Sequence, residues 1–531
     1  MIKAKKLFLR FFLGLIAAAA LVAGTYFVTV SAMKPAAEQT FPEETVAPEV
    51  KNSAVSKESK TEKTVTVSFE DAGGKTYSIE GAVGESYELP DAAQFPGYNF
   101  LGWCNEKGEI LKGDTVTLEA DGKYSPLYIV ALDTQNHSPY IFPDDKGFFH
   151  VYEQLSRGEA VQMLACLLAV DVEGTGNYMD VAPDAEYALA ASKMYQLQIV
   201  RGSKLHPDEI ISRAELLSML AAFYPASGEV FSFADVAQTD EIYEVCCTAA
   251  ALGWIESGEK VQVKPDELLT KLEAVKLINT VLGRGEGLEV TKYMERYAPD
   301  IAFDDPDYVH LLEAGMEHTY ELSGGKESWT EYESQFIPVH PGAYYTKYGM
   351  RLVDDSGVMV RGETVGLVDY DQRGRITSGM PELDKLVEEQ MNMLIRDEDD
   401  TQLQMLRIMY DYVTHCFSYQ KGHIQVDADV SWANDLAYEF LTTGKGNCYA
   451  FSAGFAAFAK ALGYDAAIQP GCMGEDDALH CWVTINMGGK EYIFDPEFEN
   501  ARLTMHDEVH DMFMMTETFI NIWKYQPFTS K

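Results

Sequence analysis

The sequence predicts a multidomain protein: a small β domain, then a mainly α-helical repeat region, then a mixed α+β domain at the C-terminal end. Alternating apolar residues broken by glycine turns fill residues 65–132. A helical motif recurs about every 57 residues within 137–323. Beyond residue 380, amphipathic helical patterns give way to two strands. At 531 residues the chain is also too long for one ordinary core.

Composition narrows the classes of partner. A formal net charge of -41 argues against binding nucleic acid, because neutralising phosphates needs clustered Lys and Arg. It also disfavours docking to an anionic membrane surface. The hydrophobic fraction of 47% and the aromatic fraction of 12% are typical of folded domains.

The N-terminus has the pattern of an export signal. Basic residues precede an apolar run that ends in Ser31-Ala32. Residues 1–32 are therefore predicted to be a signal peptide or, if uncleaved, an N-terminal membrane anchor. The Pro-, Glu- and Lys-rich residues 33–62 are predicted to be a flexible linker. We therefore expect an exported, extracellular protein.

Residues 63–133 are predicted to be the small β domain. Val65, Val67 and Phe69 alternate as on a strand, and Gly-Gly and Pro-Gly turns divide the segment. The order of residues around Gly102-Trp103 resembles the β-grasp-like internalin B-type repeat of bacterial surface proteins. That resemblance implies a spacer or weak adhesive module. A plain structural role for Trp103 in the core of a small sheet is equally compatible.

Residues 137–323 contain an internal repeat. The copies LSRGEAVQML, ISRAELLSML and LTKLEAVKLI each offer a Ser or Thr N-cap followed by Glu three residues later. This is the capping-box arrangement at the start of an amphipathic helix. The chain enters in mid-repeat, and residues 301–321 could supply the missing first half.

This repeat resembles the surface-layer homology (SLH) family, whose three units anchor exported proteins to an acidic secondary cell-wall polysaccharide. The resemblance implies that Arg157 and Arg213 contact the polymer, since a guanidinium holds a carboxylate with two hydrogen bonds. The third copy has Lys271, so we expect one weaker or empty groove. The alternative is that these residues are surface charges at helix caps.

Two further expectations concern structure alone. Residues 326–379 have short alternating runs between Gly-containing turns, which predict a bridge of β-hairpins. The eight cysteines are scattered through a large chain, so we expect mostly free, buried thiols rather than a disulfide framework.

Residues 380–531 carry the candidate chemistry. The stretch GKGNCYAFSAGFAAFAKALGY predicts a buried helix that is capped by Asn447, begins at Cys448 and stops at Gly463. A thiol in the first turn of a helix feels the positive end of the helix dipole, which favours the thiolate. Position alone does not separate a nucleophile from an inert buried cysteine.

A predicted hairpin brings two further groups together. In LHCWVTINMGGKEYIFDPEFEN a turn at Gly488-Gly489 pairs Trp482 with Asp495, whether the turn has two or four residues. His480 and Asp495 then share one face as diagonal neighbours, within about 7–8 Å. Facing Cys448, they would complete a set of nucleophile, base and orienting acid.

These segments resemble the transglutaminase-like superfamily, which has a papain-related α+β fold. The resemblance implies that Cys448 is the nucleophile, His480 the general base and acid, and Asp495 the group that orients the imidazole. It also implies attack on an amide, with the oxyanion held by backbone N–H at the helix start. Trp432 is a guess for a second oxyanion donor, and a core role is favoured for it.

The predicted function is an exported, wall-anchored cysteine enzyme acting on protein or peptide amides through a thioester, as protease, deamidase or cross-linker. The alternative is a non-catalytic adhesin or wall-organising scaffold. No cofactor or metal is expected, because no calcium-loop pattern is present. A zinc site of Cys448, Cys472, His480 and Cys481 fits no familiar spacing.

Overall fold

The computed structural model describes residues 63–528, except for 112, 286, 289–297, 334–338, 397–399, 423–428 and 507–509. The predicted signal segment 1–32 and linker 33–62 lie outside the described residues. Among the residues described, no helix is long and apolar enough to cross a membrane. The chain divides into two compact units. The first comprises residues up to Leu132 with Leu168–Glu173 and Leu217–Pro265, and the second comprises the rest.

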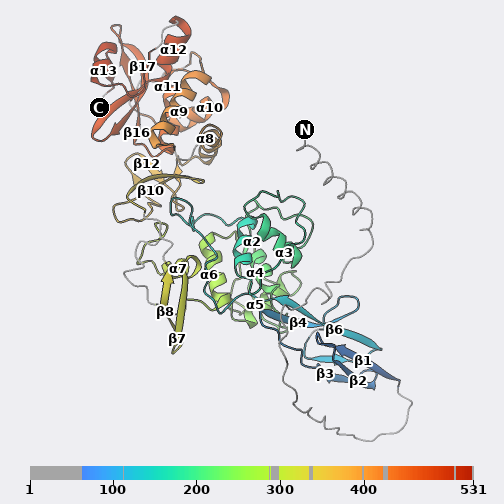
Figure 1. Ribbon diagram of the computed structural model, residues 1–531. Coiled ribbons are helices and arrows are strands. Elements are labelled where there is room, and N and C mark those ends of the chain that lie inside the picture. The colour runs from blue at the N-terminus through green and yellow to red at the C-terminus, as the bar shows by residue number, and fades with distance from the viewer. Residues whose placement is uncertain are drawn as a thin grey trace, which may run out of the picture. The chain divides into compact units, whose positions relative to one another are not determined.

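The first unit contains a mixed four-stranded sheet with strand order β2-β1-β6-β4, drawn in blue in Figure 1. The β1 and β6 strands are parallel, and the other two pairs are antiparallel. A separate antiparallel pair joins β3 to β5. The elements of this unit are β1 (Thr64–Glu70), β2 (Thr76–Ala82), β3 (Ser86–Glu88), β4 (Tyr98–Asn105), β5 (Thr115–Thr117), β6 (Gly122–Val130) and α5 (Tyr243–Ala251).

The predicted alternation of β1 sets the core of this sheet. Val65, Val67 and Phe69 are all buried on one face. Trp103 is 1% exposed, contacts Phe69 edge-on at 5.1 Å, and donates its ring N–H to the carbonyl of Pro90. A satisfied ring N–H and full burial give Trp103 a structural role in this core.

The second unit begins with the helical repeats. It contains α2 (Arg157–Cys166), α3 (Ala188–Gln196), α6 (Lys271–Leu282) and α7 (Tyr308–Gly315), and the division between the units falls within α4 (Arg213–Ala221). The predicted capping boxes are confirmed at all three copies: Ser156 with Glu159, Ser212 with Glu215, and Thr270 with Glu273.

The three copies close on one another through backbone hydrogen bonds. The N–H of Leu155 donates to the carbonyl of Leu269, Ile211 donates to Leu155, and Leu269 donates to Ile211, at 2.9–3.1 Å. Each copy therefore gives one bond and receives one. This cyclic pattern gives the region its pseudo-three-fold order.

A repeated carboxylate contact shows how the incomplete first copy is completed. Asp180, Asp235 and Asp300 each accept backbone N–H groups from a turn in which one residue has a φ of 53–56°. The corresponding turns are 205–206, 263–264 and 149–150. Since Asp300 lies at the end of the region and its turn at the beginning, the last half-repeat closes the ring onto the first.

Hairpins follow the helices, as the turn residues predict. The first, β7 (Glu317–Ser323) with β8 (Lys326–Glu333), is drawn in yellow in Figure 1. It is followed by a second hairpin and a three-stranded sheet with order β11-β12-β13. Their strands are β9 (Gly342–Thr346), β10 (Gly349–Val353), β11 (Thr364–Val365), β12 (Val368–Tyr370) and β13 (Ile376–Thr377).

The C-terminal part is α+β, with helices packed on an antiparallel sheet of order β18-β17-β16-β19. Its central helix, α11, is buried along most of its length and contacts α9, α10, β16 and β17. The helices are α8 (Pro381–Leu394), α9 (Gln402–Cys416), α10 (Ala433–Thr443), α11 (Cys448–Ala461), α12 (Pro496–His506) and α13 (Glu517–Trp523). The strands are β14 (Ser418–Tyr419), β15 (Lys445–Gly446), β16 (Ala466–Met473), β17 (Ala478–Met487), β18 (Lys490–Phe494) and β19 (Gln526–Pro527).

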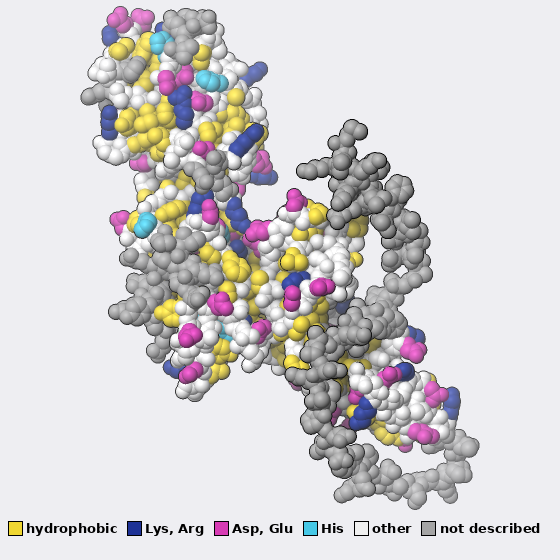
Figure 2. Space-filling view, viewed as in Figure 1, with side chains coloured by type: hydrophobic (Ala, Val, Ile, Leu, Met, Phe, Trp, Pro, Cys, Tyr) yellow, Lys and Arg dark blue, Asp and Glu magenta, His cyan; other side chains and the backbone are white. Residues whose placement is uncertain are grey.

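Figure 2 shows the charged side chains on one face of the molecule. On the face shown in Figure 2, the Lys and Arg side chains of described residues lie singly or in small groups among Asp and Glu.

Candidate active site in the C-terminal domain

Cys448 is the first residue of α11, as predicted. The Asn447 side chain caps the helix by accepting the N–H of Ala450 at 3.2 Å. Gly463, with a φ of 80°, follows the last turn and donates its N–H to the carbonyl of Lys460. The N–H of a first helical residue has no partner within its own helix. Cys448 therefore combines a thiol and a backbone donor at the positive end of a buried helix.

The predicted hairpin forms with the predicted register. A two-residue turn at Gly488-Gly489 joins β17 to β18, and Val483 lies opposite Phe494. One further step along this register brings Trp482 opposite Asp495. The strand ends before Asp495 because a proline follows it and cannot donate to the ladder.

His480 and Asp495 form a buried ion pair. His480 Nε2 lies 2.7 Å from Asp495 Oδ2, and the two residues are 5% and 0% exposed. This contact is closer than a diagonal pairing alone requires. With Nε2 committed to the carboxylate, Nδ1 is the ring nitrogen left for Cys448.

Electrostatics link the imidazole to the thiol. Burial lowers the pKa of His480, but the charge and hydrogen bond of Asp495 and a hydrogen bond with Cys448 outweigh it. The pKa of His480 is consequently held well above its ordinary value of 6.5. An imidazole hydrogen-bonded to the sulfur is placed to exchange a proton with it, as a cysteine nucleophile requires of its base.

Two contacts that the sequence did not indicate hold Asp495 in place. The Tyr525 hydroxyl donates to Asp495 Oδ2 at 2.7 Å, the same oxygen that binds the imidazole. The N–H of Phe498 donates to the other oxygen at 3.0 Å. Burial, followed by the charge of Asp495, raises the pKa of Tyr525 well above 10, so its hydroxyl remains a donor.

Glu497 is a second carboxylate at the site, and sequence reasoning missed it. Its Oε2 lies 3.8 Å from His480 Nδ1, and it is 8% exposed. Burial raises its pKa to about 7, although the nearby His480 opposes the shift. A usable signal was present, because Glu497 stands two residues after Asp495 at the start of the helix that follows the strand.

Trp432 does not act as the guessed oxyanion donor. Its ring N–H donates to the carbonyl of Asp429 at 2.6 Å, and the ring packs edge-on against Tyr449 at 5.3 Å. The alternative zinc set is not assembled either. Among the described residues, the donor group around His480 contains Asp495 and Glu497 but no cysteine. All eight cysteines are free, as expected, but only four of them are buried: Cys246, Cys247, Cys448 and Cys481.

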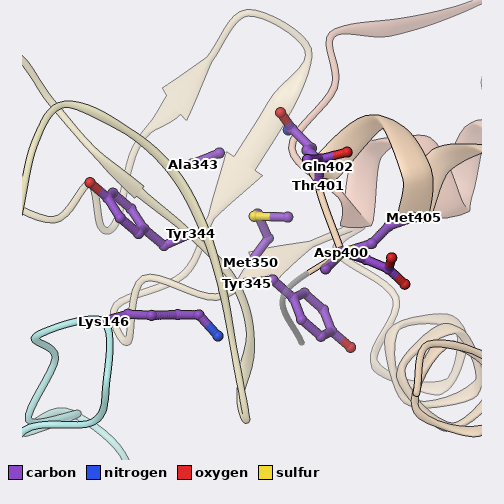
Figure 3. A pocket seen from close by; sticks show the side chains of 9 residues that line it. All are labelled: Lys146, Ala343, Tyr344, Tyr345, Met350, Asp400, Thr401, Gln402 and Met405. Atoms are coloured by element: carbon purple, nitrogen blue, oxygen red, sulfur yellow. The ribbon is translucent and has the colours of Figure 1, made fainter. Parts of the chain in front are cut away.

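A surface pocket in the second unit lies apart from this site. Figure 3 shows it between the β9–β10 hairpin and the start of α9, with Tyr345, Met350 and Gln402 among its lining residues. Cys448, His480 and Asp495 are not part of its lining. Side-chain geometry, rather than this hollow, therefore identifies the candidate chemistry.

The candidate polymer-binding residues of the repeats are engaged within the chain to different degrees. Arg157 is 9% exposed and donates to Glu209, Glu215 and two backbone carbonyls. Arg213 binds Glu267 at 2.6 Å, and its buried Nε has no hydrogen-bond partner. The Arg213 side chain as a whole is 23% exposed, against 11% for Arg157, so it is the more accessible of the two.

The third copy differs from both. Lys271 lies 3.3 Å from Glu159 and donates to the carbonyl of Phe149. Glu153 stands where the other copies have Glu209 and Glu267, but it is bound by Arg351 and Arg375 from the hairpin bridge, each at 2.6 Å. The bridge thus occupies the place beside the third copy.

Comparison with known proteins assigns the C-terminal fold. Residues 389–496 match the transglutaminase-like superfamily. These residues form a transglutaminase-like domain. The match contains Cys448, His480 and Asp495, and it covers the helices and hairpin that bring these residues together.

Two individual relatives were also found. A cellulosome-anchoring protein of Acetivibrio thermocellus is 25% identical over 217 residues, which is 37% of this chain and 47% of that protein. The chain thus spans about half the length of this curated relative. A crystal structure from Cytophaga hutchinsonii, assigned provisionally to the cysteine proteases, is 20% identical, with a TM-score of 0.18. It covers 22% of this chain and 37% of that one.

Proposed function

We propose that the C-terminal domain is a cysteine enzyme that acts on protein or peptide amides. The observation that carries the proposal is the buried pair of His480 Nε2 and Asp495 Oδ2 at 2.7 Å, beside a cysteine at a helix N-terminus. The transglutaminase-like fold of residues 389–496 supports it. A domain that only binds its partner has no need for all three groups.

The proposed reaction begins when Cys448 Sγ attacks the amide carbon and its proton passes to His480 Nδ1. The backbone N–H of Cys448 stabilises the oxyanion. The C–N bond then breaks as His480 returns the proton to the leaving amine, which gives a thioester on Cys448. Attack by water releases an acid, whereas attack by a second amine forms a new amide. Asp495 keeps the imidazole in the orientation both steps need.

The test compares wild-type protein with Cys448→Ala and His480→Ala on a panel of glutamine-containing peptides, with and without an amine acceptor. Mass spectrometry detects cleavage, deamidation or a new cross-link. Wild-type protein is expected to turn over at least one class, and Cys448→Ala to lose turnover by about 10³-fold or more. Turnover retained in Cys448→Ala contradicts the proposal.

Alkylation gives a readout that needs no known substrate. Iodoacetamide labelling of Cys448 at about pH 6 is expected to be at least ~10-fold faster in wild type than in His480→Ala. Cys416 is exposed and lies outside the site, so its labelling in the same samples serves as the internal control. Equal labelling of Cys448 in both proteins would favour the scaffold alternative.

We further propose that the repeat region holds the protein on an acidic cell-wall polysaccharide. The cyclic closure of Leu155, Ile211 and Leu269 and the partial exposure of the Arg213 side chain support this. Arg213→Ala is expected to weaken pull-down by purified wall material more than Lys271→Ala does, because the bridge already occupies the third copy. Equal binding by both variants, or binding that survives removal of the acidic polysaccharide, would count against wall anchoring.

A further inference from the structure

A second cluster of histidines and carboxylates lies far from Cys448. His137 precedes α2, Glu313 lies on α7, His318 on β7 and Glu327 on β8. The four residues are 0–6% exposed. One potential ligand atom from each lies within 4.8 Å of the others. Four polar side chains from separate segments thus converge inside the second unit.

The distances within the cluster match those of a metal coordination shell. His137 Nδ1 lies 2.9 Å from His318 Nε2. Glu313 Oε2 lies 3.2 and 3.3 Å from these two nitrogens, and Glu327 Oε1 lies 3.3 and 3.4 Å from them. Ligand bonds of about 2.0–2.1 Å around a tetrahedral zinc ion place neighbouring donor atoms about 3.3 Å apart. The five distances lie close to the edges of that tetrahedron.

The surrounding groups orient these donors. The backbone carbonyl of Met316 lies 2.9 Å from His318 Nδ1, so a proton on Nδ1 leaves the Nε2 lone pair facing the cluster. The His318 ring stacks on Trp329 at 3.7 Å, and the His137 ring stacks on Tyr320 at 3.8 Å. Both imidazoles are therefore held in position by contacts outside the cluster.

The carboxylates are also fixed. The Trp329 ring N–H donates to Glu313 Oε1 at 3.1 Å and to Glu327 Oε1 at 2.9 Å. Gly285 donates its N–H to Glu327 Oε2, and a Cβ at Gly285 would lie 2.9 Å from Glu313 Cγ. The backbone at Gly285 thus approaches too closely for any other residue without a shift.

One buried oxygen, Glu313 Oε2, lies near both imidazoles but accepts no hydrogen bond. The buried Arg284 gives its Nη hydrogens to backbone carbonyls of residues 133–138 instead. A divalent ion among these groups would offset the charge of the two buried carboxylates.

We propose that His137, Glu313, His318 and Glu327 bind one divalent transition-metal ion, with Zn²⁺ as the best fit. Imidazole nitrogen and carboxylate oxygen suit this ion, and a tetrahedral set favours zinc over magnesium or calcium. Four protein ligands at a fully buried position leave no open place for a substrate. The site is therefore structural, and it ties the segment before α2 to the β7–β8 hairpin.

The first test uses the full chain as purified. After incubation with Zn²⁺ and extensive dialysis, elemental mass spectrometry is expected to find about one zinc per chain. The double variant His318→Ala/Glu327→Gln is expected to retain less than ~0.1. The matched control His415→Ala/Glu317→Gln, which changes exposed residues of the same types, is expected to retain about one. Wild-type protein without zinc, or a ligand variant with a full equivalent, would overturn the proposal.

A second test does not depend on whether the ligand variants fold. Wild-type protein loaded with Co²⁺ is expected to show the intense visible ligand-field absorption of a tetrahedral ion. Chelation should change the tryptophan fluorescence of wild type but not of Trp329→Phe, because Trp329 stacks on a ligand. Absence of the cobalt absorption, or the same fluorescence change in both proteins, would contradict a metal at this position.

Discussion

Two buried clusters in this chain combine imidazole and carboxylate groups but arrange them differently. In the C-terminal cluster, Asp495 takes one nitrogen of His480 and leaves the other for Cys448. In the repeat-region cluster, one nitrogen of His137 and one of His318 point at each other and at two glutamates. The same residue types therefore support proton transfer in one place and metal binding in the other.

The difference lies in the number of donors that converge on one point. His480 has a second carboxylate, Glu497, at 3.8 Å from Nδ1, but its raised pKa keeps much of it protonated near neutral pH. A protonated carboxyl group is a poor metal ligand. The repeat-region cluster instead presents two nitrogens and two oxygens at coordination distances.

Asp495→Asn should produce the largest difference between the two clusters, because it should lower activity at Cys448 and leave zinc binding intact. An amide in place of the carboxylate removes the charge that stabilises the His480 imidazolium and favours the wrong tautomer. Amide turnover, or Cys448 alkylation if no substrate is known, is expected to fall by about 10³-fold. Zinc content, measured on the same preparation, is expected to stay unchanged. Loss of zinc in this variant would indicate that the two clusters are coupled.

Glu497→Gln should change how stability depends on pH. The folded-state pKa of Glu497, about 7, lies above its ordinary value of 4.5, so the folded state favours the protonated form. This contribution is fully present below pH 4.5 and is lost as pH rises through about 7. The difference corresponds to about 3 kcal/mol.

Urea unfolding curves recorded across that pH range, with the protection of α11 peptides from protease as the readout, measure the effect. The unfolding free energy of Glu497→Gln minus that of wild type is expected to rise by about 3 kcal/mol between pH 4.5 and pH 8. The exposed Glu491→Gln on β18 serves as a control with a flat difference. A flat difference for Glu497→Gln as well would mean that Glu497 is ionised throughout.

The sequence predicted those features of the candidate site that depend on nearby residues. The turn at Gly488-Gly489 fixes the β17–β18 register, and this register carries His480 and Asp495 to one face. Asn447 and Gly463 mark the ends of α11 for the same local reason. The helical repeat was also readable, because its capping pattern recurs within short windows. The predicted domain boundaries differ from the two compact units, which divide the repeat region between them.

Contacts between distant segments could not be predicted in this way. Tyr525 reaches Asp495 across 30 residues, and no pattern in the sequence links them. His137 and His318 are 181 residues apart, so they form no short ligand motif in the sequence. No metal site was predicted for this reason. The two histidines meet because the last half-repeat returns to the first, which brings the hairpin after α7 beside the segment before α2.

Trp329→Phe tests the surroundings of the repeat-region cluster. Phenylalanine keeps a ring against His318 but removes the N–H that binds Glu313 and Glu327. Outer contacts of this kind typically contribute 10–100-fold to metal affinity, so zinc affinity is expected to fall by about that factor. Competition with a chelator of known affinity measures it. Cys448 alkylation is expected to be unchanged, and unchanged zinc affinity would mean that the indole N–H does not orient the ligands.

Tyr525→Phe should have the smallest effect on the measured rates. It tests the contacts around the His480–Asp495 pair, as Trp329→Phe tests those around the repeat-region cluster. The change removes one hydrogen bond to Asp495 Oδ2 but keeps the ring edge-on to Trp482 at 4.9 Å. A hydrogen bond to a charged group contributes about 1.5–3 kcal/mol, and only the part that orients the imidazole reaches the rate. We expect kcat, or the alkylation rate of Cys448, to fall by about 10-fold, while Tyr412→Phe on α9 has no effect. A kcat that stays constant while stability falls would give Tyr525 a packing role and leave Asp495 oriented by the N–H of Phe498 alone.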